Sequence, residues 1–285
     1  MIIVRITGGL GNQMFQYALG RSLSEISGKN LKLDISAYQT YNTHNFLLDK
    51  LNTRYEIVAQ KEVEQIFGAK KRISIPFISS NKVKIVKEKA LSFNPNIMNV
   101  KKDAYFIGYW QSEKYFKNVR SKILEEFQPN EKISKKRKEI LNEIKSARSP
   151  ISVHIRRGDY VSNIKANNIH GTCEPEWYKT AANSIKNYFE DVTYFVFSDD
   201  PDWVKRNIRF DQKTILVEPD VDGKDYEDLY MMAACDGHII ANSTFSWWGA
   251  WLNSKSNKRV IAPSRWFKSQ TIKNVDLIPA DWICL

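Results

Sequence analysis

Two adjacent arginines stand in the most chemically informative stretch of this chain, HIRRGDY at 154–160. Neighbouring guanidinium groups repel each other, so a fold keeps Arg156 and Arg157 together when an anion lies between them or when they point apart. Arginine binds phosphate through two parallel N–H bonds, and backbone N–H groups can add further donors. The stretch therefore indicates either a phosphate site or a pair of structural ion pairs.

Two titratable side chains accompany these arginines. Asp159 follows Arg157 by two residues, and its carboxylate can orient an arginine or accept a proton as a general base. His154 falls inside the apolar run before the arginines, where a histidine is more often packed in the core than catalytic. The RGD tripeptide is interpreted as a chance match to the adhesion motif.

A glycine-rich stretch, GGLGNQ at 8–13, follows the first apolar run. It is not the GxGxxG fingerprint, because Met14 stands at the third glycine position, and the GxxxxGK[ST] loop is absent. Two interpretations stay open. The stretch is a turn that needs positive φ, or it lets the backbone approach a ligand to which Asn12 and Gln13 offer amide hydrogen bonds.

The stretch NSTFSWWGA at 242–250 places Asn, Ser and Thr directly before a predicted helix. These are favoured capping residues, but a helix N-terminus with hydroxyls also binds anions. Trp247 and Trp248 are assigned to the core rather than to a sugar-binding platform. The Asn-Ser-Thr glycosylation sequon is set aside, because the chain is expected to be cytoplasmic.

Two DxD strings, Asp200–Asp202 and Asp220–Asp222, are of the kind that holds a divalent metal in some nucleotide-sugar enzymes. With sixteen aspartates in the chain, such strings also arise by chance. The arginines can supply the electrostatic stabilisation that a metal would give. No metal site is predicted.

The elements that must position these residues alternate between strand and helix. A strand at 2–7, a helix at 12–27 and a strand at 31–35 form a β-α-β unit, and Gly28 fits a helix C-cap. A strand is predicted at 104–110 and helices at 111–127 and 131–147, whereas 36–103 has no clear pattern. Further strands are predicted at 151–155, 193–198, 214–218, 238–242 and 259–263. The intervening helices are predicted at 175–189, 201–208, 225–235 and 245–253. The pattern predicts an α/β fold with parallel, doubly wound sheets in two domains, 1–149 and 150–285.

In such sheets ligands bind beyond the carboxyl ends of the strands. Four polar strings, RRGD, SDD, EPD and NST, follow strands of the second predicted sheet. They should therefore converge on one crevice. The residues themselves indicate a phosphate-binding crevice suited to a nucleoside diphosphate, and they specify neither base, sugar nor reaction.

The chain of 285 residues carries a net charge of +11 that lies in one segment. Residues 61–149 hold 21 Lys or Arg against 10 Asp or Glu, whereas the remainder is balanced. The excess is either a set of solvated faces or a surface for anionic lipid. Nucleic acid is not expected, since no RNA-binding string, zinc finger or interleaved aromatic pattern accompanies the lysines. Three scattered cysteines and the absence of a signal peptide or apolar span indicate a reduced, cytoplasmic protein.

The motifs together resemble those of the α-1,2-fucosyltransferases, family 11 of the glycosyltransferases, of the bacterial type. The resemblance rests on GGLGNQMFQYALGRSL, HIRRGDY, YFVFSDD and DLYMMAACDGHIIANSTFSWWGAWL in that order. It covers the first 20 residues and most of 151–263, and residues 36–103 match no motif. It implies a GT-B fold of two facing Rossmann-like domains, with 1–149 on the acceptor side and 150–285 binding the nucleotide sugar. Animal members carry an N-terminal membrane anchor that this chain is expected to lack.

The activity implied by the resemblance is inverting, metal-independent transfer of L-fucose from GDP-β-L-fucose to O2 of a terminal β-galactoside. The acceptor is expected to be an oligosaccharide of O-antigen or other surface polysaccharide, carried on a lipid, with peripheral contact to the inner membrane. No cofactor is implied.

The resemblance also assigns roles to individual residues. Arg156 should contact the β-phosphate. The resemblance does not assign the base that takes the proton of the acceptor hydroxyl: Asp159 is the candidate, with His154 and Glu174 as alternatives. The oxocarbenium character of the transition state leaves open a further alternative, that no strong base is needed. The nucleotide-sugar contacts implied or predicted are Asn12, Gln13, His154, Arg157, Asp228, Ser243, Thr244 and Phe245. Among these, Asp228 should contact guanine and Asn12 should face the fucose.

Two other classes of function stay open. One is a different GDP-sugar transferase, such as an O-fucosyltransferase that acts on protein. The other is a non-catalytic protein that binds polyanions through its positive charge.

Overall fold

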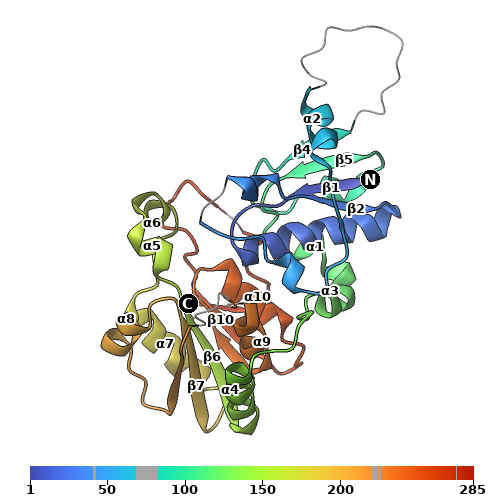
Figure 1. Ribbon diagram of the computed structural model, residues 1–285. Coiled ribbons are helices and arrows are strands. Elements are labelled where there is room, and N and C mark those ends of the chain that lie inside the picture. Colours follow the sequence, from blue (N-terminus) through green and yellow to red (C-terminus); the bar gives the residue numbers. More distant parts are fainter. Residues whose placement is uncertain (41–42, 69–82, 220–223, 225, 274) are drawn as a thin grey trace, which may run out of the picture. The chain divides into compact units, whose positions relative to one another are not determined.

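The computed structural model describes residues 1–40, 43–68, 83–219, 224, 226–273 and 275–285 (Figure 1). These residues form two compact units. The first unit holds the chain up to Asn130 together with a short segment around Asp276. The second unit begins at Glu131 and includes the C-terminal residues 278–285.

The first unit is built on a parallel five-stranded sheet in the order β3-β2-β1-β5-β4. Its strands are β1 (Ile2–Arg5), β2 (Leu31–Asp34), β3 (Glu56–Ile57), β4 (Lys84–Lys87) and β5 (Ala104–Ile107). Its α-helices are α1 (Leu10–Ser27), α2 (Gln60–Gly68) and α3 (Arg120–Glu126), and its 3₁₀ helices are Ser36–Gln39, Leu48–Lys50, Pro95–Asn99, Glu113–Tyr115 and Lys117–Val119. From β1, the next two strands along the chain, β2 and β3, extend the sheet to one edge. β5 pairs with the other side of β1, and β4 forms the other edge.

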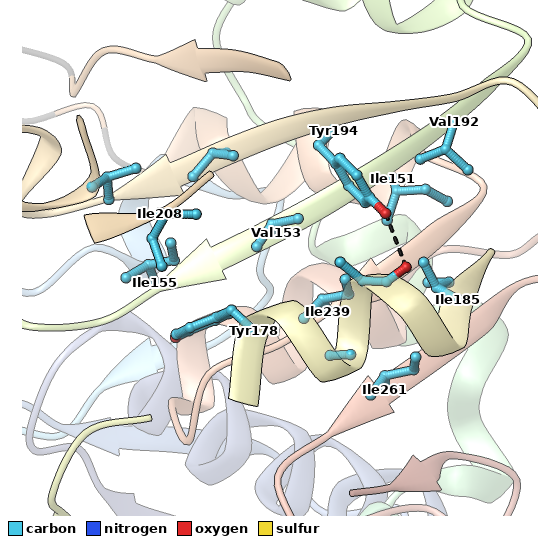
Figure 2. Packing of buried hydrophobic residues seen from close by; sticks show 14 residues of the cluster. Ile151, Val153, Ile155, Tyr178, Ile185, Val192, Tyr194, Ile208, Ile239 and Ile261 are labelled. Carbon is cyan, nitrogen blue, oxygen red and sulfur yellow. Dashed lines mark hydrogen bonds between the residues drawn. The ribbon is translucent and has the colours of Figure 1, made fainter. Parts of the chain in front are cut away.

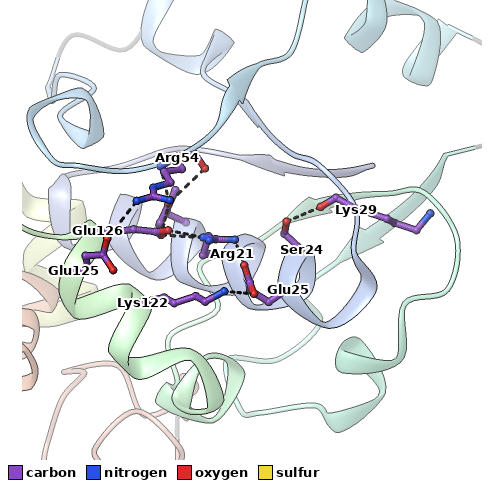
Figure 3. A network of polar contacts seen from close by, with 9 residues as sticks. Arg21, Ser24, Glu25, Lys29, Arg54, Lys122, Glu125 and Glu126 are labelled. Atoms are coloured by element: carbon purple, nitrogen blue, oxygen red, sulfur yellow. Dashed lines mark hydrogen bonds and ion pairs between the residues drawn. The ribbon is translucent and has the colours of Figure 1, made fainter.

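A network of polar contacts joins α1 to α3 in this unit (Figure 3). Arg21 of α1 donates from Nε to Glu126 of α3 over 2.7 Å. Glu25, one turn further along α1, pairs with Lys122 of α3. Glu126 is only 3% exposed, so its pairing with Arg21 compensates for its burial. The network therefore holds α1 and α3 together.

The second unit is built on a parallel six-stranded sheet in the order β11-β10-β9-β6-β7-β8. Its strands are β6 (Ser149–Ile155), β7 (Val192–Ser198), β8 (Thr214–Val217), β9 (Gly237–Ile239), β10 (Arg259–Ala262) and β11 (Ile283–Cys284). Its helices are α4 (Lys135–Ser146), α5 (Gly158–Ser162), α6 (Ile164–His170), α7 (Pro175–Ile185), α8 (Pro201–Asn207), α9 (Tyr226–Ala234) and α10 (Thr244–Leu252). The chain runs from β6 to one edge of the sheet and then from β9 to the other edge, so the strand order reverses between β6 and β9.

Both faces of this sheet are covered. Ile151, Val153 and Ile155 of β6 pack with the apolar face of α7, as Figure 2 shows. A hydrogen bond of 3.0 Å from the Tyr194 hydroxyl to the Ala182 carbonyl ties β7 to the same helix. The alternate side chains of β6 point to the other face, which α10 covers, because successive side chains of a strand point to opposite faces.

A buried histidine marks that other face. His238 of β9 is wholly buried, and its ring nitrogens lie 2.8 Å from Ser152 Oγ and 2.8 Å from Asn253 Nδ2. The Asn253 amide also donates to the Cys235 carbonyl, so His238 Nε2 is the acceptor. Nδ1 therefore carries the proton and donates to Ser152. The neutral ring joins β6, β9 and the C-terminal end of α10.

The structure confirms the α/β class, the parallel sheets and most of the expected elements in the second unit. One expectation was wrong: 111–127 is two 3₁₀ turns followed by the short helix α3 rather than one helix. Two short helices, α5 and α6, and the edge strand β11 were not expected. No helix in the described part of the chain combines the length and apolar character needed to cross a bilayer.

The two units also differ from the expected ranges 1–149 and 150–285. The helix α4 belongs to the second unit, where the guanidinium of Arg137 lies 2.8 Å from Asp228 of α9 and donates to the Glu218 carbonyl. Near the C-terminus, Asp276 belongs to the first unit, because it accepts from the Phe93 N–H over 2.8 Å and pairs with Lys114. The sequence did not reveal either partner, since each lies far away along the chain.

We expect the free energy of unfolding to fall as the pH is lowered from 7 to 5. Burial, with the positive charges nearby, lowers the pKa of His154 to about 3 and that of His238 well below its usual value. Below pH ~6.5 the unfolded chain therefore binds protons that the folded chain does not, at a cost of about 1.4 kcal/mol per pH unit for each histidine. Urea titrations followed by tryptophan fluorescence at pH 7, 6 and 5 would measure the slope. An unchanged free energy across this range would contradict the buried, neutral state of both rings.

Candidate active site

The reversal of strand order between β6 and β9 defines the place where a ligand is expected to bind in the second unit. Arg156 follows β6 directly, and the segment 240–243 leads from β9 into α10. The ring centroids of His154 and Phe245 are 5.7 Å apart, so the structure brings the ends of these two strands together. The predicted convergence of the RRGD and NST strings is therefore observed.

Arg156 is held by two carboxylates. Its guanidinium donates to Asp159 and lies 2.8 Å from Asp199 Oδ2. Its side chain is 26% exposed. Burial lowers its pKa, but Asp199 and Asp159 outweigh that effect and raise the pKa further above its usual value. Arg156 is thus a permanent cation at the edge of the sheet.

Arg157 points elsewhere. Its guanidinium carbon lies 3.9 Å from the ring centroid of Trp203 on α8, and its Nε is 3.4 Å from Asp200. Asp200 also caps α8 by accepting from the Trp203 N–H. The guanidinium of Arg157 therefore secures α8, which is the structural alternative left open by the sequence, and its predicted contact with the nucleotide stays a prediction.

Asp199 connects the two arginines. Asp199 Oδ1 accepts from the backbone N–H of Arg157 over 2.8 Å, and Asp199 Oδ2 pairs with Arg156. Gly158 approaches this carboxylate so closely that a Cβ at that position would lie 2.5 Å from Asp199 Oδ2. The two arginines and the three carboxylates Asp159, Asp199 and Asp200 leave the cluster with one net negative charge. A phosphate that bound Arg156 through Nη1 and Nη2 would therefore compete with these carboxylates.

His154 is only 6% exposed, and its Nδ1 has no hydrogen-bond partner among the described residues. Burial and the neighbouring Arg156 lower its pKa to about 3, so the ring is neutral at physiological pH. Such a ring is a very weak base. The structure thus places His154 near the end of β6, next to Phe245, and disfavours it as the proton acceptor.

The N-terminus of α10 faces the same edge. Ser243 is the N-cap, and its hydroxyl accepts from the Phe245 N–H over 3.3 Å. Thr244 and Phe245 are half-buried, in contrast to the seven residues of α10 that follow them, Ser246 to Leu252, which are buried. The first turn of α10 therefore combines partial exposure with the positive end of a helix dipole. Trp247 and Trp248 are wholly buried, as expected for the core.

Asp228 lies on α9 and is 14% exposed. Its carboxylate lies 2.8 Å from the guanidinium of Arg137, which is itself 1% exposed. The pair joins α9 to α4 within the second unit. The predicted contact of Asp228 with guanine stays a prediction, and the second DxD string lies outside the described residues.

In the first unit the glycine-rich stretch also lies where the strand order reverses, between β1 and β5. The Asn12 amide oxygen accepts from Gln111 Nε2 over 2.9 Å, and Gln111 lies beyond β5. The Gln16 amide likewise joins Thr7 to the Gly108 carbonyl. These bonds fix the first turns of α1, which carry Asn12, to the segment that follows β5.

Gln13 has a different part from the one predicted. It is wholly buried, and its amide donates to the carbonyls of Gly8 and Asn45 and accepts from the Leu47 N–H. A side chain with this environment has no free surface to offer a ligand. The structure therefore assigns Gln13 to holding two loops together, which differs from the predicted contact.

Several residues of the site were not selected from the sequence. Asp199 lies in the SDD string that was noted, but its pairing with Arg156 had no sequence signal. Asn242 is 2% exposed and donates to the carbonyls of His170, Gly171 and Trp266. Glu174, by contrast, was named from the sequence as an alternative base, and it is exposed immediately before α7. Its role stays a prediction.

Two doubly wound α/β units, one with an arginine and a helix N-terminus at its strand reversal, define an architecture of the kind used by nucleotide-sugar transferases. The chain matches the family model described as glycosyl transferase family 11 over residues 1–285. The protein therefore belongs to this family and is a glycosyltransferase, which transfers a glycosyl group from a nucleotide-sugar donor to a glycan acceptor.

Three relatives illustrate the range of the family. The chain is 37% identical to an Escherichia coli α-1,2-colitosyltransferase, with 99% of this chain and 98% of the relative covered. It is 30% identical to the Escherichia coli O-antigen biosynthesis glycosyltransferase WbnK, with 92% and 93% covered. It is 25% identical to a galactoside 2-α-L-fucosyltransferase of Caenorhabditis elegans, with 90% and 70% covered.

The fold is also found in a solved structure. A variant of Arabidopsis thaliana FUT1 in complex with GDP matches 98% of this chain and 74% of its own length, with a TM-score of 0.54 at 10% identity. This likeness concerns the fold, and it agrees with the GT-B-like class of two Rossmann-like units.

We expect the Gly158→Ala variant to lose turnover by about 10-fold or more, since misplacing a reacting group by about 1 Å can cost ~10²-fold. The added methyl would push Asp199 away from Arg156. Turnover of the donor and the melting temperature should be measured together, with Gly68→Ala as the control, because a Cβ at Gly68 meets nothing within 4 Å. Equal turnover in both variants would show that the close approach at Gly158 has no part in the site.

Proposed function

We propose that the protein is an inverting transferase that moves L-fucose from GDP-β-L-fucose to O2 of a terminal β-galactoside. The observation that carries the proposal is the position of Arg156 at the strand reversal of the second unit, two residues after His154, whose ring lies 5.7 Å from that of Phe245 in the first turn of α10. This arrangement suits the diphosphate of a nucleotide sugar. Galactoside 2-α-L-fucosyltransferase activity in the Caenorhabditis elegans relative supports the choice of sugar and acceptor.

The mechanism is a single in-line displacement at the anomeric carbon. The acceptor O2 forms the new glycosidic bond as the bond to the β-phosphate breaks, and the configuration inverts. GDP leaves with growing negative charge, which Arg156 and the first turn of α10 stabilise. Losing one such preorganised donor typically costs about 10²- to 10³-fold in turnover. No step requires a metal ion, because the arginine and the helix N-terminus receive the charge.

Asp159 is the candidate base. In the structure its carboxylate accepts a hydrogen bond from Arg156, so it occupies donors that the diphosphate needs. When the diphosphate takes these donors, the carboxylate is released beside an anion and becomes a better proton acceptor. Donor binding would thereby prepare the base for the acceptor hydroxyl.

Colitosyl transfer is a second candidate, because the Escherichia coli α-1,2-colitosyltransferase covers almost the whole chain. Colitose is fucose without the 3-hydroxyl group. A site that hydrogen-bonds this hydroxyl rejects the deoxy sugar by about 10⁴-fold, whereas an apolar site rejects an added hydroxyl by only about 10²-fold. The ratio of the two donors therefore identifies which sugar the site is built for.

The protein should release GDP from its donor only when lactose is present, and it should do so in EDTA. The assay compares GDP-fucose and GDP-colitose at equal concentrations, and NMR of the product determines the linkage. A higher kcat/KM with GDP-fucose supports fucosyl transfer, and the reverse supports colitosyl transfer. Loss of activity in EDTA that returns with a divalent cation would contradict the metal-independent mechanism.

If neither donor releases GDP, calorimetry with GDP distinguishes the remaining functions. Specific binding of GDP would point to another GDP-sugar or another acceptor, including a protein acceptor. Absence of GDP binding together with salt-sensitive binding to heparin would favour the polyanion-binding alternative.

The Asp159→Asn variant should bind GDP more tightly than the wild type while it transfers sugar about 10²-fold more slowly or worse. The first effect follows because a neutral amide competes less well for Arg156, and the second because the base is gone. Calorimetry and single-turnover rates would measure the two effects. Unchanged turnover would remove Asp159 from the base role, and weaker GDP binding would refute its competition with phosphate.

The remaining expectations concern location. O-antigen biosynthesis by the Escherichia coli relative WbnK supports a lipid-linked oligosaccharide acceptor at the cytoplasmic face of the inner membrane. The excess positive charge lies in residues 61–149. Exposed lysines of this segment are available for contact with anionic lipid, including Lys84, Lys87, Lys135 and Lys138. Peripheral attachment stays a prediction.

A further inference from the structure

An aromatic ring lies behind the guanidinium of Arg156. The Arg156 guanidinium carbon is 5.5 Å from the ring centroid of Tyr160. The Tyr160 ring is stacked on His170, with centroids 4.6 Å apart and planes 4° from parallel. The His170 ring is in turn 5.7 Å from the ring of Phe267. The Arg156 guanidinium and the rings of Tyr160, His170 and Phe267 thus contact one another in succession. We call the three rings the aromatic column.

The ring contact differs in kind from the ion pairs of Arg156. Asp159 and Asp199 hold the guanidinium through its N–H groups, which are the groups that a phosphate must use. An aromatic face attracts the cation through its π system and uses none of the N–H donors. The Tyr160 contact can therefore persist while Arg156 exchanges a carboxylate for a phosphate.

Backbone hydrogen bonds hold the aromatic column in place. The carbonyl of His170 accepts from the Asn242 side chain over 3.0 Å and from the Lys268 N–H over 3.1 Å. Asn242 is buried and lies two residues before α10 begins. The column and the N-terminus of α10 therefore share one anchor. The Tyr160 carbonyl is separately bound by Asn167 over 2.7 Å.

We infer that Tyr160, backed by His170, is the positioning residue that keeps the Arg156 guanidinium directed at the leaving diphosphate after Asp159 has released it. The inference rests on the proposed function, because it concerns the same arginine and the same phosphate. Without the ring, the guanidinium has only the carboxylates to hold it and settles on Asp199. The Tyr160 hydroxyl is 3.5 Å from the Asn242 carbonyl, a long contact, so the ring rather than the hydroxyl carries the effect.

The test compares Tyr160→Leu with Tyr160→Phe. We expect Tyr160→Leu to lower kcat by about 10-fold and Tyr160→Phe to restore most of it, in line with the strength of a partly buried cation–π contact. The KM for lactose should not change. Tyr188→Leu is the matched control, since Arg259 lies 5.4 Å over the Tyr188 ring, which is 48% exposed. Tyr188 precedes β7, whereas Asp199 of the site follows the other end of that strand.

A double-variant cycle separates positioning from simple loss of structure. In an Arg156→Ala background, Tyr160→Leu should cause no further loss of kcat, because the ring acts only through that arginine. An additive loss would overturn the inference. His170→Leu should reproduce part of the Tyr160→Leu effect, and His170→Phe should not, since it keeps a ring for stacking.

The mobility of Arg156 can be measured without any donor, which distinguishes failure of this inference from failure of the proposed function. The ¹⁵N resonance of Arg156 Nε, assigned by its disappearance in Arg156→Lys, should show faster side-chain motion in Tyr160→Leu than in the wild type or Tyr160→Phe. Unchanged motion would overturn the inference even in an active enzyme. Faster motion in a chain that transfers neither sugar would support the positioning of Arg156 and refute the proposed donors.

Discussion

The pairing of β6 between β7 and β9 is the constraint on which the rest of the site depends. Every residue of β6 is buried, so its alternate side chains must suit two different helix layers. Ile151, Val153 and Ile155 face α7, whereas Ser152 and His154 face α10. The same alternation continues into the next two residues. Arg156 contacts Tyr160 of α5, whereas Arg157 contacts Trp203 of α8, which explains how two adjacent arginines avoid each other.

The regular alternation of apolar strands and helices was sufficient to predict most of the second unit. The strand-end strings also predicted where its site would lie, because in a parallel sheet all carboxyl ends share one edge. The partners of the charged groups could not be predicted. Asp199 reaches Arg156 and Asp276 reaches Lys114 across long stretches of chain, and no local pattern records such contacts. In the first unit, β3 has only two residues, too few to show a period.

The segment after β5 shows how local spacing can mislead. Apolar residues between 111 and 127 recur as they would on a helix, but Trp110 takes a φ of 58° and the Ser112 side chain caps a 3₁₀ turn. Glu88 accepts from the backbone N–H groups of Tyr109 and Trp110 and so stabilises this unusual turn. Tertiary contacts override local preference there. The turn at Trp110 also places Gln111 beside Asn12, at the strand reversal of the first unit.

The arginines of the site in the second unit already hold carboxylates, and the cluster carries one net negative charge. Such a site has little attraction for a stray anion, and a ligand gains from it only by replacing a carboxylate with matching geometry. Under the proposed function, this exchange would favour a diphosphate over simple anions. The attraction that brings the ligand to the protein must then come from charges outside the cluster.

The return of the chain to the first unit at Asp276 has a consequence for biosynthesis. Every strand described in the first unit has been synthesised once Ile107 is reached. The carboxylate that Phe93 and Lys114 contact, that of Asp276, is made more than a hundred residues later. The second unit likewise receives its edge strand, β11, only after that segment has passed. Neither unit can therefore be completed on the ribosome before the other is almost fully translated. A chimaera that exchanges one unit between two members of the family would have to exchange the segment around Asp276 as well.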